Sequence, residues 1–293
     1  MRWLISLLLF TLAIPAQAAI TVRDDMGVEV RLTAPARRIV SLSPHGTELL
    51  FAAGAGEYIV GTVAHSDYPE AATRIPQVGT YVAFDLERIV ALRPDLVVAW
   101  SSGNGKAEAL ERLTSFGIRV YSTEPRKLDD IATSLEKLGM LAGTPGTGNA
   151  AAQTFRARLA RLRARYAQRE PVSVFYQVWR GPLFTLGGPH IFSRVVEVCG
   201  GRNVFGELNT LALSVDLEAV LAADPQAIIA SGMGEERPDW LDDWRQWPQL
   251  RAVHAGHLFF IPPNLLQRPT PRLLDGAERL CEALDRVRGE RSE

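Results

Sequence analysis

The stretch "DLERIVALRPDLVVA" (residues 85–99) recurs in a related form as "DLEAVLAADPQAIIA" (residues 216–230). Six of the fifteen aligned positions are identical, and most of the other apolar positions exchange one aliphatic residue for another. Each copy opens with an aspartate that can cap a short helix, reaches a proline that ends the helix, and closes with an apolar strand. Two unrelated helix–strand units can share such a pattern by chance, so the rest of the chain decides what the repeat means.

Strands and helices alternate around the first copy. Residues 37–43 are predicted to form a buried strand, after which Ser43 and Pro44 provide the N-cap and first-turn proline of a helix that ends at Gly54. Further predicted elements follow: strand 95–100, helix 106–116, strand 118–121 and helix 128–141. Continuous apolar strands are typical of a parallel sheet covered on both faces, so this half is predicted to be α/β.

A long helix is predicted to separate the two halves. Residues 143–149, "GTPGTGN", interrupt the alternation, and residues 150–168 are all good helix formers with one apolar face. At 1.5 Å per residue this helix is about 28 Å long. Together with the leader, the predicted parts are these: a signal peptide (1–18), an N-terminal α/β lobe (19–143), the linking helix (144–169) and a C-terminal α/β lobe (170–293).

The alternation restarts in the second half. Its predicted elements are strand 172–178, helix 191–201, a helix capped by Asp216, strand 227–231, a segment at 240–247, strand 258–262 and helix 272–288. The repeat therefore occupies the equivalent place in two Rossmann-like lobes with mostly parallel sheets, joined by a single helix. The carboxyl ends of parallel strands and the loops after them hold ligands, so a ligand cleft is expected between the lobes.

The N-terminus has the pattern of a secretory signal peptide. A basic residue, an apolar run over residues 4–14 and the small-residue site "AQA" (16–18) follow one another, so we expect an exported protein. In an exported chain an isolated pair of cysteines, Cys199 and Cys281, favours a disulfide over a metal site, with two separate buried thiols as the alternative. The net charge of −1 argues against nucleic acid as a partner.

No catalytic residue or metal site is predicted. The segment "SSGNGKAE" (101–108) lacks the first glycine and the Ser/Thr of a phosphate-binding loop, and neither G-x-S-x-G nor H-E-x-x-H occurs. The five histidines are scattered along the chain. An exported enzyme is therefore the weakest of the possible functions.

Aromatic residues at predicted strand ends are the candidate binding residues. Tyr68, Tyr81 and Trp100 lie in the first half, and Tyr176 and Trp179 end a strand in the second. The segment "NLLQRPTPR" adds polar groups in Asn264, Arg268 and Arg272. Flat rings with a few polar groups suit a large planar or amphipathic ligand, and ordinary packing is the alternative for each ring.

Several of these segments carry a resemblance to a known family. The segments are "SLSPHGTELLFAAG", "SDYPE", "LERIVALRPDLVVAW", the "GN" that follows this tryptophan, "EVCGGRNVF", "PQAII" and "RPTPR". With them the chain resembles the periplasmic substrate-binding proteins of ABC importers for iron-siderophores, haem and cobalamin, in which one long helix bridges two α/β lobes. The cobalamin-binding members are the most similar.

The resemblance implies a role for each candidate residue. Tyr68 would pack on the corrin ring of cobalamin, Trp100 would line the floor of the cleft, and the strand end with Tyr176 and Trp179 would cover the ligand from the other lobe. Arg268 matches an arginine of the cleft. The chain departs from the cobalamin binders at three positions: Tyr81 and Leu265 replace tryptophans, and Asn264 replaces an aspartate. Cys199 and Cys281 match a disulfide pair of the family.

The repeated phrase also acquires a second meaning. Glu87 and Glu218 each lie in the first turn of their predicted helix, where a carboxylate interacts favourably with the helix dipole. The resemblance implies that they also dock on arginines of the two permease subunits of an ABC importer. It further implies a periplasmic monomer with no cofactor, for which cobalamin or a related corrinoid is the transported ligand.

Haem or a ferric siderophore is the alternative ligand on the same scaffold. Haem needs an axial side chain in the cleft, for which Tyr68, Tyr81 and His65 are candidates. An anionic siderophore needs several cleft cations, and the available ones are Arg180, Arg268 and Arg272.

Overall fold

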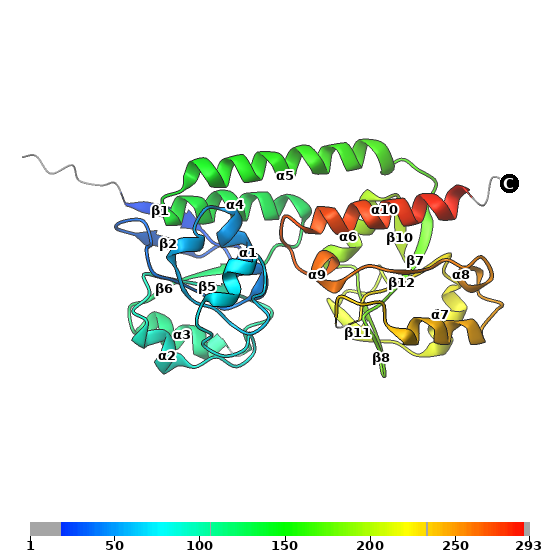
Figure 1. Cartoon of the computed structure of the whole chain (residues 1–293), viewed down its shortest axis with the longest axis horizontal. Helices are drawn as coiled ribbons and strands as arrows, with labels where there is room; N and C mark the ends of the chain where they lie inside the picture. Colours follow the sequence, from blue (N-terminus) through cyan, green and yellow to red (C-terminus); the bar gives the residue numbers. More distant parts are fainter. Residues whose placement is uncertain (1–18, 106, 233, 290–293) are drawn as a thin grey trace, which may run out of the picture.

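The computed structural model describes residues 19–105, 107–232 and 234–289 (Figure 1). Two α/β lobes lie side by side, and long helices run along one side of both (Figure 1). The predicted signal peptide, residues 1–18, lies outside the described residues. Among the described residues, no helix has the length and apolar character that a membrane span requires.

The N-terminal lobe is built on a four-stranded parallel sheet with the strand order β4-β3-β5-β6. The strands are β3 (Ile39–Ser41), β4 (Ile59–Gly61), β5 (Leu96–Trp100) and β6 (Arg119–Thr123). The helices of this lobe are α1 (Pro44–Ala52), α2 (Leu86–Ala91), α3 (Ala107–Ser115) and α4 (Leu128–Ala142), with 3₁₀ turns η1 (Gly56–Tyr58) and η2 (Glu70–Arg74). An antiparallel hairpin of β1 (Ile20–Arg23) and β2 (Glu29–Leu32) precedes them.

The C-terminal lobe repeats this sheet. Its parallel strands have the order β10-β7-β12-β13, so that both sheets place their strands in the chain order second, first, third, fourth. The strands are β7 (Val172–Gln177), β10 (Gly201–Asn203), β12 (Ala227–Ala230) and β13 (Leu258–Phe260). The helices are α6 (Ile191–Val198), α7 (Leu217–Ala223), α8 (Arg251–His254), α9 (Pro263–Leu266) and α10 (Leu273–Gly289), with the 3₁₀ segment η3 (Asp239–Gln246).

The repeated phrase occupies the same place in each lobe. It forms α2 and β5 in the first lobe and α7 and β12 in the second, and β5 and β12 are the third strands of their sheets. Asp85 caps α2 by accepting hydrogen bonds from the backbone N–H groups of Glu87 and Arg88. Asp216 stands at the N-cap position of α7 without a capping bond from its side chain. The prediction of two similar lobes with parallel sheets is therefore confirmed.

Two predicted elements of the second lobe differ in the structure. The helix predicted over residues 191–201 ends at Val198, because Gly200 adopts a left-handed φ of 66° and the chain then enters β10. A small antiparallel sheet, which was not predicted, follows β7. It consists of β8 (Trp179–Arg180), β9 (Leu183–Leu186) and β11 (Ala212–Ser214).

The linking helix α5 (Pro145–Tyr166) lies within the predicted linking segment 144–169 and begins before the helical run predicted over residues 150–168. Pro145 occupies its first turn, so only Gly143 and Thr144 separate α4 from α5. The glycine-containing start is tolerated because it packs on α4: a Cβ on Gly148 would lie 2.6 Å from the carbonyl oxygen of Leu135. Tertiary packing thus outweighs the weak helix propensity of glycine at this position.

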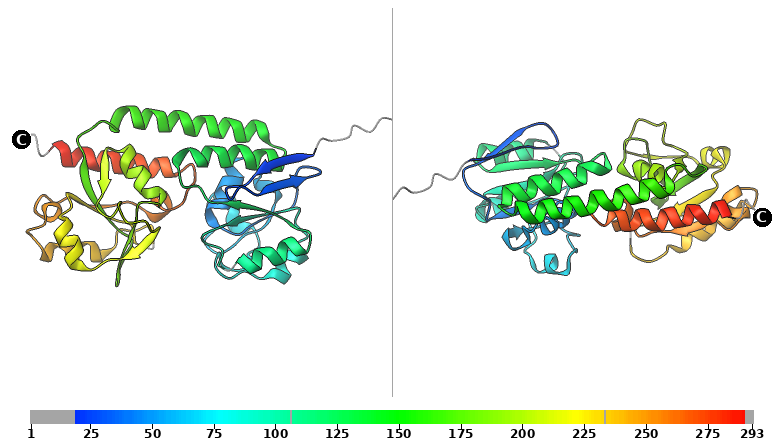
Figure 2. Two further views of the ribbon diagram at one scale, coloured as in Figure 1. Left: turned by 180° about the vertical axis from the view of Figure 1, so that it is seen from behind. Right: turned by 90° about the horizontal axis from the view of Figure 1, so that it is seen from above.

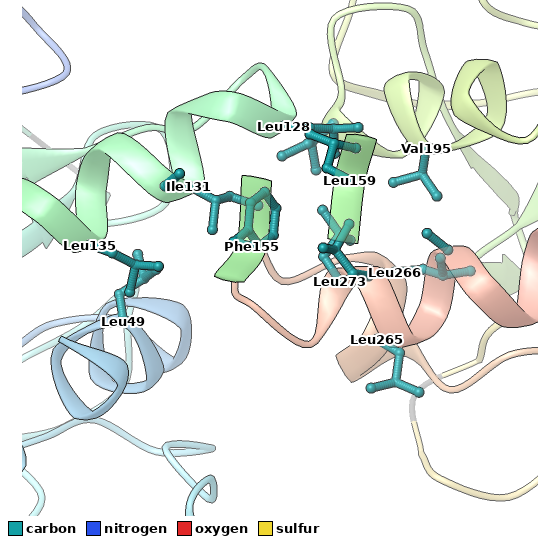
Figure 3. Close-up of a cluster of buried hydrophobic side chains, with 14 of the residues drawn as sticks. Leu49, Leu128, Ile131, Leu135, Phe155, Leu159, Val195, Leu265, Leu266 and Leu273 are labelled. Atoms are coloured by element: carbon teal, nitrogen blue, oxygen red, sulfur yellow. The ribbon is translucent and has the colours of Figure 1, made fainter. Parts of the chain in front are cut away.

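The two lobes share one apolar core along α5. Figure 3 shows Leu135 of α4, Phe155 and Leu159 of α5, and Val195 and Leu273 of the second lobe within one cluster of buried side chains. Seen from above, α5 runs over both lobes (Figure 2). Because the lobes are joined by a continuous packed core as well as by a helix, we expect their relative movement to be small.

Cys199 and Cys281 form the predicted disulfide, which joins the end of α6 to α10. We expect thiol titration of the unfolded, unreduced protein to detect no free thiol, and titration after reduction to detect two. The Cys199→Ser variant serves as the control, because it leaves a single thiol. Two thiols in the unreduced native protein would contradict the disulfide.

Candidate functional site

A cavity of about 270 Å³ lies between the lobes. The last residue of β5 and the chain segments that follow β3, β4, β12 and β13 border it, as expected where the carboxyl ends of two parallel sheets face each other. Its lining residues are Pro44, His45, His65, Tyr81, Trp100, Gly232, Pro263, Asn264, Gln267, Arg268 and Pro269. Four of the predicted binding residues therefore line the cavity: Tyr81, Trp100, Asn264 and Arg268.

A larger hollow of about 650 Å³ lies beside the start of α4 and the helices α5 and α6. No aromatic ring of the described part of the chain lines it, and two of its arginines are paired with its own acids, Arg163 with Asp129 and Arg194 with Glu197. The smaller cavity is the candidate site, because it combines aromatic rings, polar groups and loops of both lobes.

Trp100 forms the aromatic floor with two neighbours. Its ring centroid lies 5.1 Å from that of His45, which meets it edge-on, and 5.6 Å from that of Tyr81. Asn104 fixes this arrangement, since its side-chain oxygen accepts a hydrogen bond from the backbone N–H of Trp100 and its Nδ2 donates to the backbone carbonyl oxygens of Leu42 (2.7 Å) and Tyr81 (2.8 Å). The floor is therefore held in place before any ligand arrives.

Gly103 is required by this floor. A Cβ at position 103 would lie 1.9 Å from Cε3 of the Trp100 ring, so any larger residue would displace the tryptophan. This contact explains why the dipeptide Gly103–Asn104 follows the strand that ends in Trp100.

His45 is a buried polar side chain in the wall of the cavity. It is 3% exposed, and its Nε2 has no hydrogen-bond partner among the described residues. Burial, together with the positive charge of Arg268, lowers the pKa of His45 from 6.5 to about 3. The imidazole is therefore neutral at physiological pH. His45 was not among the binding residues predicted from the sequence, and only its place directly after the Ser43–Pro44 helix start could have suggested it.

Polar side chains from the other lobe face this floor. Asn264 is in α9 and donates to Glu235 Oε1, while Gln267 follows α9 and donates to Ser231 Oγ at 2.7 Å. These amides give the cavity hydrogen-bonding groups without a net charge. Gln267 was not selected from the sequence, although it lies between two residues that were.

Tyr176 is in the core and not at the surface of the cleft, contrary to the prediction. It has no exposed area, and its ring stacks on Phe192 at a centroid distance of 4.0 Å. Burial raises the pKa of Tyr176 to about 12, and its hydroxyl accepts a hydrogen bond from Gln267 Nε2 at 3.2 Å. Tyr176 therefore acts on the cavity by positioning Gln267. Leu265 is also in the core, 8% exposed.

A network of four charged residues crosses between the lobes. The side chain of Glu48 in α1 is 2% exposed and accepts hydrogen bonds from Arg268 Nη1 (3.1 Å) and from Arg272 Nη2 (2.6 Å) and Nε (2.9 Å). Arg268 also donates to Asp67 Oδ1 (2.8 Å) and to the carbonyl oxygen of His65 (3.1 Å). We call Glu48, Asp67, Arg268 and Arg272 the interlobe network. In the sequence, Asp67 and Glu48 lie 201 and 220 positions before Arg268.

The other two predicted aromatic residues lie outside the wall of the cavity. Tyr68 is 45% exposed, and the guanidinium of Arg272 lies over its ring, 3.7 Å from the centroid. Trp179 is 41% exposed in β8. Both offer ring surface to solvent, but the structure does not bring them together with Trp100.

Glu87 and Glu218 are both exposed, in the first turns of α2 and α7. Figure 1 shows these two helices on the side of their lobes away from α5. Among the described residues, neither carboxylate makes an ion pair shorter than 4.0 Å. Each is thus free to meet a partner on that side of the molecule.

Comparison with known proteins adds to this geometry. The profile of the family described as "Periplasmic binding protein" matches residues 39–265. The vitamin B12-binding protein of Vibrio parahaemolyticus is 37% identical over 260 residues, which cover 88% of this chain and 92% of that protein. That of Yersinia pseudotuberculosis is 35% identical over 283 residues, 97% of this chain and 92% of that protein.

Solved structures show the same likeness. The periplasmic vitamin B12-binding protein BtuF of Vibrio cholerae has a TM-score of 0.80 at 36% identity, covering 87% of this chain and 98% of that one. A periplasmic heme-binding protein from Pseudomonas aeruginosa has a TM-score of 0.75 at 26% identity, covering 85% of this chain and 92% of that one.

Proposed function

This chain belongs to the periplasmic binding protein family, and from that premise we propose that it captures cobalamin (vitamin B12) in the cavity between its lobes and delivers it to an ABC importer. The relatives with the highest identities given above are named as vitamin B12-binding proteins. In this role the protein acts in the periplasm after export, binds cobalamin as cargo and needs no chemistry of its own.

The aromatic floor beside uncharged amides is the observation that carries the proposal. Trp100 and Tyr81 provide flat apolar surface, and Asn264 and Gln267 provide donors and acceptors opposite to it. A corrin ring is flat and carries amide side chains around its edge, so it can use both kinds of group at once. We assign Arg268 as a further hydrogen-bond donor to these amides.

The exposed rings of Tyr68 and Trp179 are proposed to hold the part of the ligand that extends beyond the cavity. The cavity of about 270 Å³ is small for a ligand of this size, since sites for drug-sized molecules commonly have about 300–1,000 Å³. We therefore propose that a corrinoid extends beyond the cavity and contacts the exposed rings of Tyr68 and Trp179.

Glu87 and Glu218 are proposed to dock on cationic groups of the two permease subunits of the importer. Their exposure, their lack of a partner in the described chain and their equivalent places in two lobes support this role. A pair of equivalent carboxylates suits a membrane partner with two-fold symmetry, and charge pairs at the rim of an interface set orientation and association rate.

Calorimetric titration of the mature protein with cyanocobalamin tests the proposal. We expect one-to-one binding of cyanocobalamin and no comparable heat with haemin or a ferric siderophore. Replacement of Trp100 by Ala should weaken binding by at least about tenfold, because a large aromatic contact is lost. Trp247→Ala is the matched control, since Trp247 packs in a separate cluster of the second lobe and does not line the cavity.

Binding of haemin in place of cyanocobalamin would overturn the assignment of the ligand. The heme-binding relative with 26% identity shows that this fold can carry such a ligand, and His65 and Tyr81 would then be the axial candidates in the cavity. Equal loss of affinity in the two tryptophan variants would show that the loss is not specific to the floor.

A further inference from the structure

The cavity has a single charged lining residue, and the charge of this residue is neutralised. Among the described residues, Arg268 is the only Lys, Arg, Asp or Glu side chain in the cavity wall. It is 14% exposed and pairs with both Glu48 and Asp67. Arg272 pairs with the same Glu48, so that the interlobe network contains two cations and two anions in direct contact.

We propose that Asp67 and Glu48 are specificity-determining residues, which cancel the charge of Arg268 so that the cleft accepts an uncharged, amide-bearing ligand and rejects an anionic one of the same size. This inference rests on the proposed function, because it concerns what the same cavity selects. It assigns a selective role to two carboxylates that do not themselves line the cavity.

The hydrogen bonds of Arg268 explain how it can bind an uncharged amide-bearing ligand and disfavour an anionic one. A guanidinium has five N–H donors, and the bonds to Glu48, Asp67 and the His65 carbonyl occupy three of them. The remaining donors can bind an amide carbonyl, which brings no charge. A carboxylate at the same place would meet two carboxylates already bound to the arginine, and like charges a few ångströms apart repel strongly where water is scarce.

Asp67 remains charged at the pH of the periplasm. Burial alone would raise the pKa of its carboxyl, but the hydrogen bond and charge of Arg268 outweigh burial and hold the pKa below its ordinary value. His45, which also lines the wall and is affected by the charge of Arg268, stays neutral for the reason given above. The carboxylates that offset the charge of Arg268 itself are therefore those of Glu48 and Asp67.

A pair of ligands that differ in one charge tests the inference. Cyanocobalamin has no net charge, and its monocarboxylic acid derivative has one peripheral amide replaced by a carboxylate. The quantity to measure is the ratio of the Kd of the acid to the Kd of cyanocobalamin, obtained by calorimetry at low salt. For the native protein we expect a ratio above about ten, because one nearby like charge is worth about tenfold in an equilibrium constant.

Asp67→Asn should lower this ratio by about tenfold, since it removes one carboxylate and leaves the interlobe network with one uncompensated positive charge. Asp67 is half-exposed, so the variant is expected to fold. Asp129→Asn is the matched control, because Asp129 is 51% exposed, pairs with Arg163 at 3.0 Å and lies away from the cavity. It makes the same change in net charge and should leave the ratio as in the native protein.

Each outcome distinguishes the two proposals. If the native protein does not bind cyanocobalamin, the proposed function is wrong. If it binds cyanocobalamin, and the ratio for Asp67→Asn equals that of the native protein and of Asp129→Asn, the selective role of the carboxylates is wrong and the proposed function stands. A lowered ratio in Asp67→Asn alone supports the inference.

Discussion

Glu48→Gln is expected to lower the free energy of unfolding by about 3 kcal/mol. Glu48 is 2% exposed and binds two arginines of the other lobe, which are themselves 14% and 20% exposed. Glutamine has nearly the same shape but no charge, so the variant removes the carboxylate that Arg272 pairs with and leaves Arg268 paired with Asp67. Removal of one partner from a buried ion network costs more than the network itself contributes, because charges remain that water solvates poorly.

Urea denaturation of the ligand-free protein measures this loss. Glu136→Gln is the matched control, since Glu136 binds Arg156 through both carboxylate oxygens but is 30% exposed, and partly exposed pairs contribute about 0–1 kcal/mol. Equal, small losses in both variants would mean that the interlobe network is solvated in the protein and does not hold the lobes together.

The double variant Glu87→Arg, Glu218→Arg is expected to reduce cobalamin uptake to background while the Kd for cyanocobalamin stays unchanged. Both side chains are exposed at helix starts, so the exchange should not disturb the fold or the cavity. It places a cation where the docking proposal requires an anion, and juxtaposed like charges at an interface cost several kcal/mol. Each single variant should show a partial loss, because one lobe can still dock.

Uptake of labelled cyanocobalamin into vesicles that contain the cognate importer is the measurement, with calorimetry on the same preparations. Glu282→Arg is the control, as Glu282 is exposed on α10, which runs beside α5 on the opposite side of the molecule (Figure 1). Normal uptake by the double variant would disprove docking through these glutamates. Loss of uptake in the control as well would point to a general effect of charge.

The sequence predicted the two lobes because their determinants are local. Helix caps, prolines and continuous apolar strands are set by neighbouring residues, and the repeated phrase marked the equivalent third strand of each sheet. The start of α5 escaped prediction because the glycines near it look like a helix break. They are helical since Gly148 packs against α4, a contact that no local pattern encodes.

The candidate site was predictable to the extent that strand ends define it. Trp100 was found in this way, Tyr81 was found by its place just before the repeated phrase, and Asn264 and Arg268 were found as polar groups of the segment "NLLQRPTPR". Tyr176 lies in a strand whose side chains are buried on both faces, so its position in the sequence could not tell that its ring points into the core. Glu48 was missed because its partners lie 220 and 224 positions away.

The linking helix has a consequence for the competition between ligand-free and ligand-bound protein at the importer. Because α5, the shared core and the interlobe network join the two lobes, we expect the spacing between Glu87 and Glu218 to change little on ligand binding. If the docking proposal holds, an empty protein presents the same two carboxylates as a loaded one and occupies the same docking sites. Excess ligand-free protein should then compete with ligand-bound protein for the importer. The rate of import should therefore depend on the fraction of the binding protein that carries ligand, and not on the amount of ligand alone.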